Sequence, residues 1–533
     1  MNKRNLFVLS FVILIALLTG ACSGSGEISS VSEEALPVAE NPAPKPEVIE
    51  TENPTIPTQS SGSVSYLFSP IRSTSTYLMD AEGNALHIWE SAYTPGKSVY
   101  LLENGNLLRT GSVKPSKFSD TGGSGGIVEE IAPDGAVVWA YQYANGQVQQ
   151  HHDIEQMPNG NILIIAWEVK TMAEAIDAGR NPSLLNEGEL WPDHVVEVDP
   201  SSNTIVWEWH IWDHLVQDHD ASKENYGVVG EHPELIDINL TTGKAAADWN
   251  HINSIDYNAK LDQILLSVHG FSEIWIIDHA TSTEEAAGAA GDLLYRWGNP
   301  QVYDAGSSSD QQLYVQHDVQ WIPDGYPGAG NILIFNNGNK RDRPYSSVDE
   351  IVPPLNADGG YTFTGTSYGP EARIWTYVAE NLSGFFAKRI SGAQRLANGN
   401  TLICSGPEGI FFEVTPTGEV VWRYDYGAEV FRVLRYEANY IGLPDLVPGS
   451  IFPLPTSSDT DKSIEGQNND QQEQRPRLDF AAASVKLGVS EEVLKAALGT
   501  RPFDFASAAA KLGITEEALL DALGIPAGGA TGG

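Results

Sequence analysis

One recurring stretch decides the fold, and its clearest copy is Phe412-Glu413-Val414-Thr415-Pro416-Thr417-Gly418-Glu419-Val420-Val421-Trp422. Apolar residues flank a Pro-Thr-Gly turn on both sides, which predicts two antiparallel strands joined by a hairpin. The second strand ends on Val421-Trp422-Arg423-Tyr424, an ending with five further copies. Those copies are Leu86-His87-Ile88-Trp89, Val138-Trp139-Ala140-Tyr141, Val206-Trp207-Glu208-Trp209, Leu294-Tyr295-Arg296-Trp297 and Ile374-Trp375-Thr376-Tyr377.

A second element, a polar turn followed by an apolar strand, precedes the last five of these endings. Its copies are Asn104-Gly105-Asn106-Leu107-Leu108 and the segments 159–163, 261–265, 330–333 and 398–402. Turn-linked strands in regular recurrence fit the blades of a β-propeller, because closure into a ring leaves no long free edge. The repeats predict an all-β fold with six blades, in which Val430-Phe431-Arg432-Val433-Leu434 supplies the strand that closes the ring.

The N-terminus indicates export. A basic start precedes an apolar run from Leu6 to Leu18, and Thr19-Gly20-Ala21-Cys22 follows, which is typical of a signal peptide. The cysteine after this site resembles a bacterial lipobox, so residues 1–22 are a predicted lipoprotein signal with Cys22 as the lipidated residue. The prediction is a lipid anchor in the cell envelope. The outer membrane, facing the periplasm or the cell surface, is favoured because Ser23 rather than Asp follows the cysteine.

Composition divides the rest of the 533-residue chain into four predicted parts. Residues 23–62 are rich in Pro, Ser and Glu and predict a disordered tether. Residues 63–443 carry the strand repeats and predict the propeller domain, and residues 444–477 form a second polar linker. Residues 478–526 predict two 25-residue helical repeats with Gly stops and Ser or Thr N-caps. Their role stays open.

The charge balance limits the partners. Asp and Glu outnumber Lys and Arg 70 to 31, which gives a net charge of −39. This excess argues against nucleic acid and against a polybasic membrane patch. Any anionic substrate therefore requires cations or imidazoles placed locally at its site.

Three repeats carry a histidine at their head. These are His152-Asp153-Ile154, His251-Ile252-Asn253 and His317-Asp318-Val319. Equivalent positions in a closed β-array point toward a common axis, so we expect a pocket with several histidines. His151 competes with His152 for the inward direction, because strand alternation lets only one of two neighbours face the axis.

Four stretches also carry a family resemblance: Trp249-Asn250-His251-Ile252-Asn253-Ser254-Ile255-Asp256-Tyr257-Asn258, Leu293-Leu294-Tyr295-Arg296-Trp297-Gly298-Asn299-Pro300, Gln316-His317-Asp318 and Asn336-Asn337-Gly338. Together they resemble the bacterial arylsulfate sulfotransferases (arylsulfotransferases) over roughly residues 65–443. The resemblance implies a six-bladed propeller that transfers a sulfuryl group from a phenolic sulfate ester to a phenolic acceptor. It implies no nucleotide donor, and we expect no cofactor and no metal. The oligomeric state is open.

The same resemblance assigns roles to the histidines. It implies that His317 is a nucleophile that becomes transiently sulfated, with His251 and His152 in support. It also implies an arginine eighteen residues after the middle histidine, where this chain has His269 instead. A histidine carries charge only when protonated, so His269 as a sulfate ligand predicts a narrow bell-shaped pH profile.

The chemistry agrees with these assignments. Neutral imidazole is a good nucleophile near pH 7, and sulfuryl transfer should resemble phosphoryl transfer in depending on positioning and charge stabilisation. We expect Asn337, Lys340 and Arg341 to bind substrate, the two cations attracting the anionic ester. Lys340 or Arg341 is the alternative cation if His269 lies outside the site.

Two other functions fit a secreted propeller. One is a non-catalytic envelope lipoprotein that binds proteins or glycans, with incidental histidines. The other is a quinoprotein dehydrogenase, which is disfavoured because those enzymes generally use eight blades and acidic calcium ligands. A chromogenic phenyl sulfate assay with an added phenol distinguishes a transferase from a sulfatase and from a binding protein.

Overall fold

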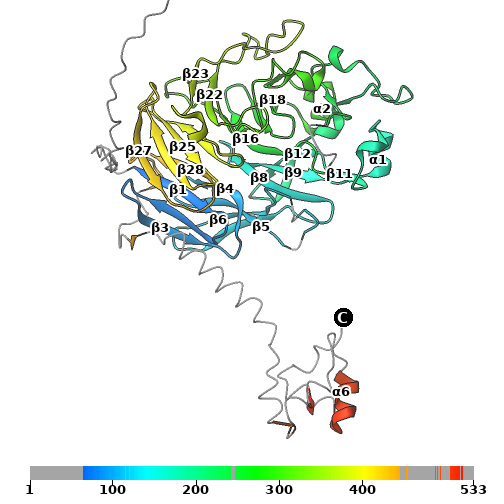
Figure 1. Ribbon diagram of the computed structural model, residues 1–533, viewed down its shortest axis with the longest axis vertical. Helices are drawn as coiled ribbons and strands as arrows, with labels where there is room; N and C mark the ends of the chain where they lie inside the picture. The colour runs from blue at the N-terminus through cyan, green and yellow to red at the C-terminus, as the bar shows by residue number, and fades with distance from the viewer. Residues whose placement is uncertain are drawn as a thin grey trace, which may run out of the picture. The chain divides into compact units, whose positions relative to one another are not determined.

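The computed structural model describes residues 64–443 apart from 115, 119–120 and 242–245, together with 452–453 and parts of 486–519. Strands dominate the described residues (Figure 1), which confirms the all-β class. The predicted signal peptide with Cys22, the tether and most of the second linker lie outside the described residues. For the predicted helical repeats the structure gives the bounds of one helix, α6 (Phe505–Leu512), so the tandem repeat stays a prediction.

Five sheets contain four or more of the described strands. The first has the order β28 (Val430–Tyr436), β1 (Ser65–Pro70), β2 (Ser75–Met79), β3 (Asn84–Glu90) and β29 (Phe452–Pro453). The second has the order β13 (Thr204–His210), β12 (Asp193–Asp199), β9 (Ile162–Glu168), β8 (Val148–Gln156), β4 (Pro95–Leu101), β5 (Leu107–Ser112), β6 (Gly126–Ile131) and β7 (Val137–Gln142).

The other three sheets are four-stranded antiparallel meanders in chain order. They are β16 (Ile252–Asn258), β17 (Gln263–Val268), β18 (Glu273–Asp278) and β19 (Tyr295–Trp297); β20 (His317–Trp321), β21 (Ile332–Asn336), β22 (Ser347–Ile351) and β23 (Trp375–Tyr377); and β24 (Gly392–Arg395), β25 (Thr401–Ser405), β26 (Ile410–Val414) and β27 (Val420–Asp425).

Short elements fill the connections. Two strand pairs are β10 (Lys170–Thr171) with β11 (Glu189–Leu190), and β14 (Leu215–Val216) with β15 (Ile236–Asp237). The helices are α1 (Met172–Asp177) and α2 (Thr283–Ala286), with 3₁₀ turns η1 (Pro182–Leu184), η2 (Ile211–Asp213), η3 (Val229–Glu231), η4 (Ala289–Gly291), η5 (Pro300–Tyr303) and η6 (Leu382–Gly384). Within the described residues, no helix has the length and apolar character needed to cross a membrane.

The sheets follow one another around a common centre (Figure 1), and this arrangement is propeller-like. Their inner strands contact in a closed cycle that runs β4, β8, β16, β20, β24, β28 and back to β4. The cycle closes because β28 pairs antiparallel with β1, with Arg435 opposite Tyr66. The strand predicted at 430–434 therefore does join the two ends of the domain.

The repeats predicted six separate sheets, but the described strands form five sheets of four or more strands. A parallel bridge between Lys97 of β4 and His152 of β8 joins two four-stranded meanders into the eight-stranded sheet. The physical cause is a bulge in each strand, because the register of β4 shifts between Pro95 and Val99 and that of β8 between Gln150 and Ile154. Bulges bend a strand and re-aim its side chains, which brings the two edges together.

Neighbouring sheets pack face to face. The middle strands β9, β17 and β21 are buried along almost their whole length, whereas the outer strands β7 and β27 are largely exposed. Tryptophans of four outer strands donate the indole N–H to the segment that leads into the outer strand of the next meander. These bonds join Trp139 to Asn203 Oδ1 at 2.8 Å, Trp297 to Pro370 O at 2.9 Å, Trp375 to Pro416 O at 2.8 Å and Trp422 to Ala81 O at 3.0 Å. These tryptophans thus link four of the meanders to the next one.

Candidate active site

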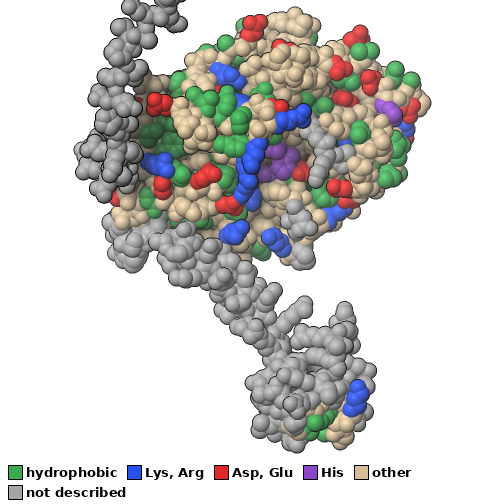
Figure 2. Space-filling view, in the orientation of Figure 1, with side chains coloured by type: hydrophobic (Ala, Val, Ile, Leu, Met, Phe, Trp, Pro, Cys, Tyr) green, Lys and Arg blue, Asp and Glu red, His purple; other side chains and the backbone are tan. Residues whose placement is uncertain are grey.

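The predicted histidines lie in one row where the inner strands begin. Ring centroids are 4.7 Å apart for His152 and His251, 5.0 Å for His251 and His269, and 5.2 Å for His269 and His317. Figure 2 shows a group of His side chains near the middle of one face, with Lys and Arg side chains beside it. Histidines separated by up to 165 positions (317 − 152) therefore meet, as the repeats predicted.

Backbone bulges place these rings. His152 and His251 have φ values of 49° and 52°, and Asp318, which follows His317, has a φ of 49°. Few residues other than glycine adopt this left-handed conformation, and it recurs at functional sites where the surrounding structure holds it. Gly123 covers His152, since a Cβ at this glycine would lie 1.8 Å from the imidazole Cε1. The sharp turn in each strand aims its histidine into the row.

His317 is held at both ring nitrogens. Its Nδ1 lies 2.8 Å from Asn337 Oδ1, and the backbone N–H of Ile390 donates to its Nε2 at 3.1 Å. The Asn337 amide orientation is fixed because its Nδ2 donates to the carbonyls of Ala387 and Ile390 at 2.7 and 2.8 Å. Asn337 Oδ1 must then accept a hydrogen bond from the Nδ1–H, which leaves the Nε2 lone pair as the nucleophilic one.

Burial lowers the pKa of His317 to about 4, although the hydrogen bond that the ring donates to Asn337 favours the charged form. The side chain is buried, with 3 % of the residue surface exposed. His317 is consequently neutral throughout the physiological range, the form that a nucleophile requires.

His251 has the opposite electrostatics. Its Nδ1 lies 2.6 Å from Asp248 Oδ2. Burial favours the neutral ring, but the carboxylates of Asp248 and Asp193 outweigh it and raise the pKa of His251. The row therefore contains a neutral nucleophile and an imidazole whose protonated form is favoured, which is the division needed for acid–base work.

His151 and His152 share the bulge of β8. Their Nδ1 atoms lie 2.9 Å apart, and His151 Nε2 lies 2.7 Å from Asp193 Oδ1. His151 stacks on Trp167 with ring centroids 3.9 Å apart, whereas His152 contacts His251. Only one of the two neighbours therefore faces the row, as predicted: His152 lies in the row, and His151 supports it from behind.

His269 lies between His251 and His317 but does not have the charge that we expected of it. Burial, together with the neighbouring His251 and His317, lowers its pKa well below the usual value. His269 is therefore neutral near pH 7. A neutral ring can donate or accept a hydrogen bond, but it does not supply the positive charge of an arginine.

The family assignment rests on the sequence as a whole. The family described as arylsulfotransferase (ASST) matches residues 66–440, which span the sheets and the histidine row. The chain belongs to the arylsulfotransferase family. No curated protein matches this chain significantly.

Solved structures show only distant likeness to this arylsulfotransferase-family chain. A protein of unknown function from Bacteroides caccae has 11 % identity and a TM-score of 0.41, covering 71 % of this chain and 100 % of its own. Apo AztD from Citrobacter koseri has 8 % identity and a TM-score of 0.34, covering 70 % and 98 %. A virginiamycin B lyase from Staphylococcus aureus, solved as an inactive variant with quinupristin, has 8 % identity and a TM-score of 0.32, covering 69 % and 86 %.

The three residues predicted to bind substrate lie in different surroundings. Asn337 is fully buried and contacts His317, so the structure shows it positioning the ring. Lys340 and Arg341 are exposed on the turn after β21, and the side chain of Arg341 is 92 % exposed beside Asp342. No contact in the described residues ties either cation to the histidine row, and their role in substrate binding stays a prediction.

A buried ion cluster lies next to the row. Arg432 of β28 donates to Asp153 at 2.6 and 3.0 Å and to Asp318 at 2.8 Å, and it also bonds the Tyr100 hydroxyl. Asp153 and Asp318 directly follow His152 and His317 in sequence. The arginine therefore ties together the strands that carry two of the site histidines.

Sequence reasoning missed several of these partners. Asp248 precedes His251 by three residues, a spacing that suggests a local contact, but nothing marks Asp193 or the Ile390 amide as part of a site. Such contacts come from strands and loops distant in sequence. Arg432 had a predicted strand but no predicted partner, because the two aspartates sit in other sheets.

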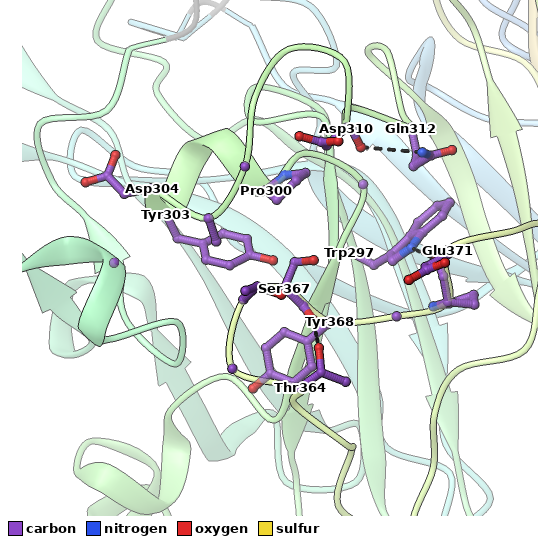
Figure 3. Close-up of a pocket in the computed structure, with 18 of the residues that line it drawn as sticks. Trp297, Pro300, Tyr303, Asp304, Asp310, Gln312, Thr364, Ser367, Tyr368 and Glu371 are labelled. Carbon is purple, nitrogen blue, oxygen red and sulfur yellow. Dashed lines mark hydrogen bonds between the residues drawn. The ribbon is translucent and has the colours of Figure 1, made fainter. Parts of the chain in front are cut away.

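The described residues contain no group of three or more His, Cys, Asp or Glu side chains arranged to hold a metal ion. A pocket of about 760 Å³ lies between the 298–312 and 364–371 loops (Figure 3). Trp297, Tyr303 and Tyr368 line it beside Asp304 and Glu371, and none of its described lining residues is a histidine.

Proposed function

We propose that this protein is an arylsulfate sulfotransferase, which moves a sulfuryl group from a phenolic sulfate ester to a phenolic acceptor through a sulfo-histidine on His317, without a nucleotide donor. One observation carries the proposal. A neutral, hydrogen-bonded His317 lies in the same row as a carboxylate-held His251, within a domain that matches the arylsulfotransferase family over residues 66–440.

The first half-reaction starts at His317. Its Nε2 attacks the ester sulfur, the N–S bond forms, and the S–O bond to the aryl group breaks with its electron pair on the phenolate. Asn337 holds the Nδ1 proton and so fixes the tautomer. The Ile390 N–H, which occupies Nε2 in the free protein, is then released to donate to a sulfuryl oxygen, where charge develops.

Protonated His251 completes the transfer. It donates its proton to the leaving phenolate, and the neutral ring then accepts the proton of the incoming phenol. The acceptor oxygen attacks sulfur, the N–S bond breaks, and His317 is restored as neutral imidazole. Asp248 at 2.6 Å stabilises His251 in the charged form before and after the two steps. His152 and His269 remain as neutral hydrogen-bonding partners for the sulfuryl oxygens.

The proposed scaffold is a six-bladed propeller. The eight-stranded sheet consists of two antiparallel meanders joined by the single Lys97–His152 bridge, so each half corresponds to one blade. Counted this way, the closed cycle of inner strands supplies one strand to each blade.

The test is a turnover assay with 4-nitrophenyl sulfate and phenol. The proposal expects release of 4-nitrophenol that rises with phenol concentration, together with phenyl sulfate as a product. Release that is independent of phenol indicates a sulfatase, and no release favours a non-catalytic protein that binds envelope proteins or glycans. Either of these results contradicts the proposed transfer.

Asp248→Asn should impair proton transfer. An amide keeps the shape but removes the Asp248 charge that raises the pKa of His251, so the pKa of the ring falls and its protonated form is less populated. We expect kcat to fall about 10- to 100-fold at pH 7. The loss should shrink with 4-nitrophenyl sulfate and grow with phenyl sulfate, because the poorer leaving group depends more on protonation. Equal losses with both esters would contradict the acid role.

We further propose that Cys22 is lipidated and anchors the mature protein in the cell envelope, where the outer membrane is favoured. The basis is the sequence alone, since residues 1–22 precede the described part of the chain. Metabolic labelling with a radioactive fatty acid should mark the wild-type protein and leave Cys22→Ser unlabelled. Label that persists in the serine variant would exclude this anchor.

A further inference from the structure

The histidine row lacks a dependable positive charge for the group it is proposed to transfer. His152, His269 and His317 all have lowered pKa values because of burial, so they are neutral near pH 7. His251 releases its proton during the reaction. A sulfate ester is anionic and its transition state spreads charge over the sulfuryl oxygens, so a cation that keeps its proton at the row would stabilise it.

Lys97 is the cation that the fold brings to this position. It lies on β4, where its backbone bridges that of His152. Its charge is near enough to contribute to lowering the pKa of the His152 ring. It lies on the bulge of β4, whereas Lys340 and Arg341 are exposed on the turn after β21.

The backbone of Lys97 is strained. Its φ is 134°, in the region that favours glycine, although glycine precedes it at Gly96. Such strain costs on the order of 1–3 kcal/mol and persists where the surroundings hold it, often at functional sites. A lysine at this point therefore requires a reason beyond local stability.

Lys97 is partly buried without a counter-ion. Among the described residues no carboxylate lies within ion-pair distance of it, and the nearby Glu429 is paired with Arg389. Burial, with the charges of Lys114 and Arg389, lowers the pKa of Lys97 to about 8 despite the attraction of Glu429. An unpaired, desolvated ammonium is poised to bind an anion.

We propose that Lys97 binds the sulfuryl oxygens of the ester beside His152 and is the cation of the transfer site at neutral pH. This inference rests on the proposed sulfuryl transfer. Lys97 stays protonated through both half-reactions, so no proton or bond is exchanged at it. Lys114 adds positive potential near Lys97 and helps to attract an anionic ester to a protein whose net charge is −39.

Lys97→Met removes the charge and keeps most of the side-chain volume. We expect kcat/KM for 4-nitrophenyl sulfate to fall about 10²- to 10³-fold, as for other preorganised groups that stabilise transition-state charge. Lys97→Arg keeps a cation on the same strained backbone and should stay within about tenfold of wild type. Lys260→Met, which changes an exposed lysine paired with Asp324, is the matched control and should not change the rate.

The pH profile separates a charge role from a structural one. Wild-type kcat/KM should fall as pH rises through about 8, because Lys97 loses its proton there. In Lys97→Arg the part of this limb that is due to Lys97 should be lost, since arginine stays charged, whereas loss of the His251 proton still lowers the rate at high pH. Chemical denaturation midpoints of the variants show whether they fold, and if Lys97→Met does not fold, the profile of Lys97→Arg decides.

Three results would overturn the inference. One is full activity in Lys97→Met, and the second is an equal loss in the methionine and arginine variants, which indicates a packing role. The third is an alkaline limb unchanged in Lys97→Arg. A wild-type protein that transfers nothing to phenol is a distinct result, which removes the proposed function and this inference with it.

Discussion

His317→Ala is expected to lower the rate of sulfuryl transfer by about four to six orders of magnitude, since losing a covalent nucleophile leaves only binding and charge stabilisation. The variant should retain the fold, because the neutral ring is held by two hydrogen bonds, to Asn337 and Ile390, and carries no ion pair within the described part of the chain. The measurement is phenol-dependent turnover of 4-nitrophenyl sulfate. Rapid acid-free quenching of the wild type should also reveal one added sulfuryl mass on the peptide that contains His317.

The matched control is His219→Ala, which removes an exposed histidine outside the row and should leave turnover unchanged. Full activity of His317→Ala would exclude His317 as the nucleophile. A sulfated peptide that contains another histidine would move the nucleophile to that position within the same proposed mechanism.

Arg432→Met should destabilise the fold more than any substitution in the histidine row. It leaves Asp153 and Asp318 buried without their shared cation, and removing one partner of a buried ion cluster typically costs about 3–5 kcal/mol of unfolding free energy. The measurement is the midpoint of denaturation in guanidinium chloride. Activity should fall as well, because these aspartates follow His152 and His317 on their strands.

Arg423→Met provides the control for Arg432→Met. Arg423 is about half exposed and pairs with Asp425 at 2.7 Å on the outer strand β27, so its loss should cost at most about 1 kcal/mol. Restoring charge balance with Asp153→Asn and Asp318→Asn in the Arg432→Met background should recover part of the stability. Equal midpoints for Arg432→Met and Arg423→Met would show that the cluster does not hold the sheets together.

The repeats in the sequence were sufficient to predict the strands and the meeting of the histidines. Turn residues such as those at 415–418 specify hairpins locally. The strand at 430–434 was predicted to supply a strand that the first repeat lacks, and it pairs with β1. His152, His251 and His317 could be placed together because each occupies a corresponding place in its repeat, and the family resemblance added His269.

Electrostatics and fine geometry could not be predicted in the same way. Whether His269 carries charge depends on its burial beside His251 and His317. The spacing of residues in the sequence does not predict that burial. The bridge that fuses β4 and β8 depends on bulges that the alternation of apolar residues does not reveal. Lys97 escaped notice for the same reason, because it has no motif of its own.

The pairing of β1 with β28 has a consequence for how the chain is made. Residues 65–70 pair with β2 on one edge, but their other edge pairs with residues 430–436, so that edge stays unpaired until almost the entire domain has been synthesised. Contacts so distant in sequence slow folding and prolong the exposure of unpaired, aggregation-prone strand edges. The ring therefore cannot close until the strand at residues 430–436 has been synthesised.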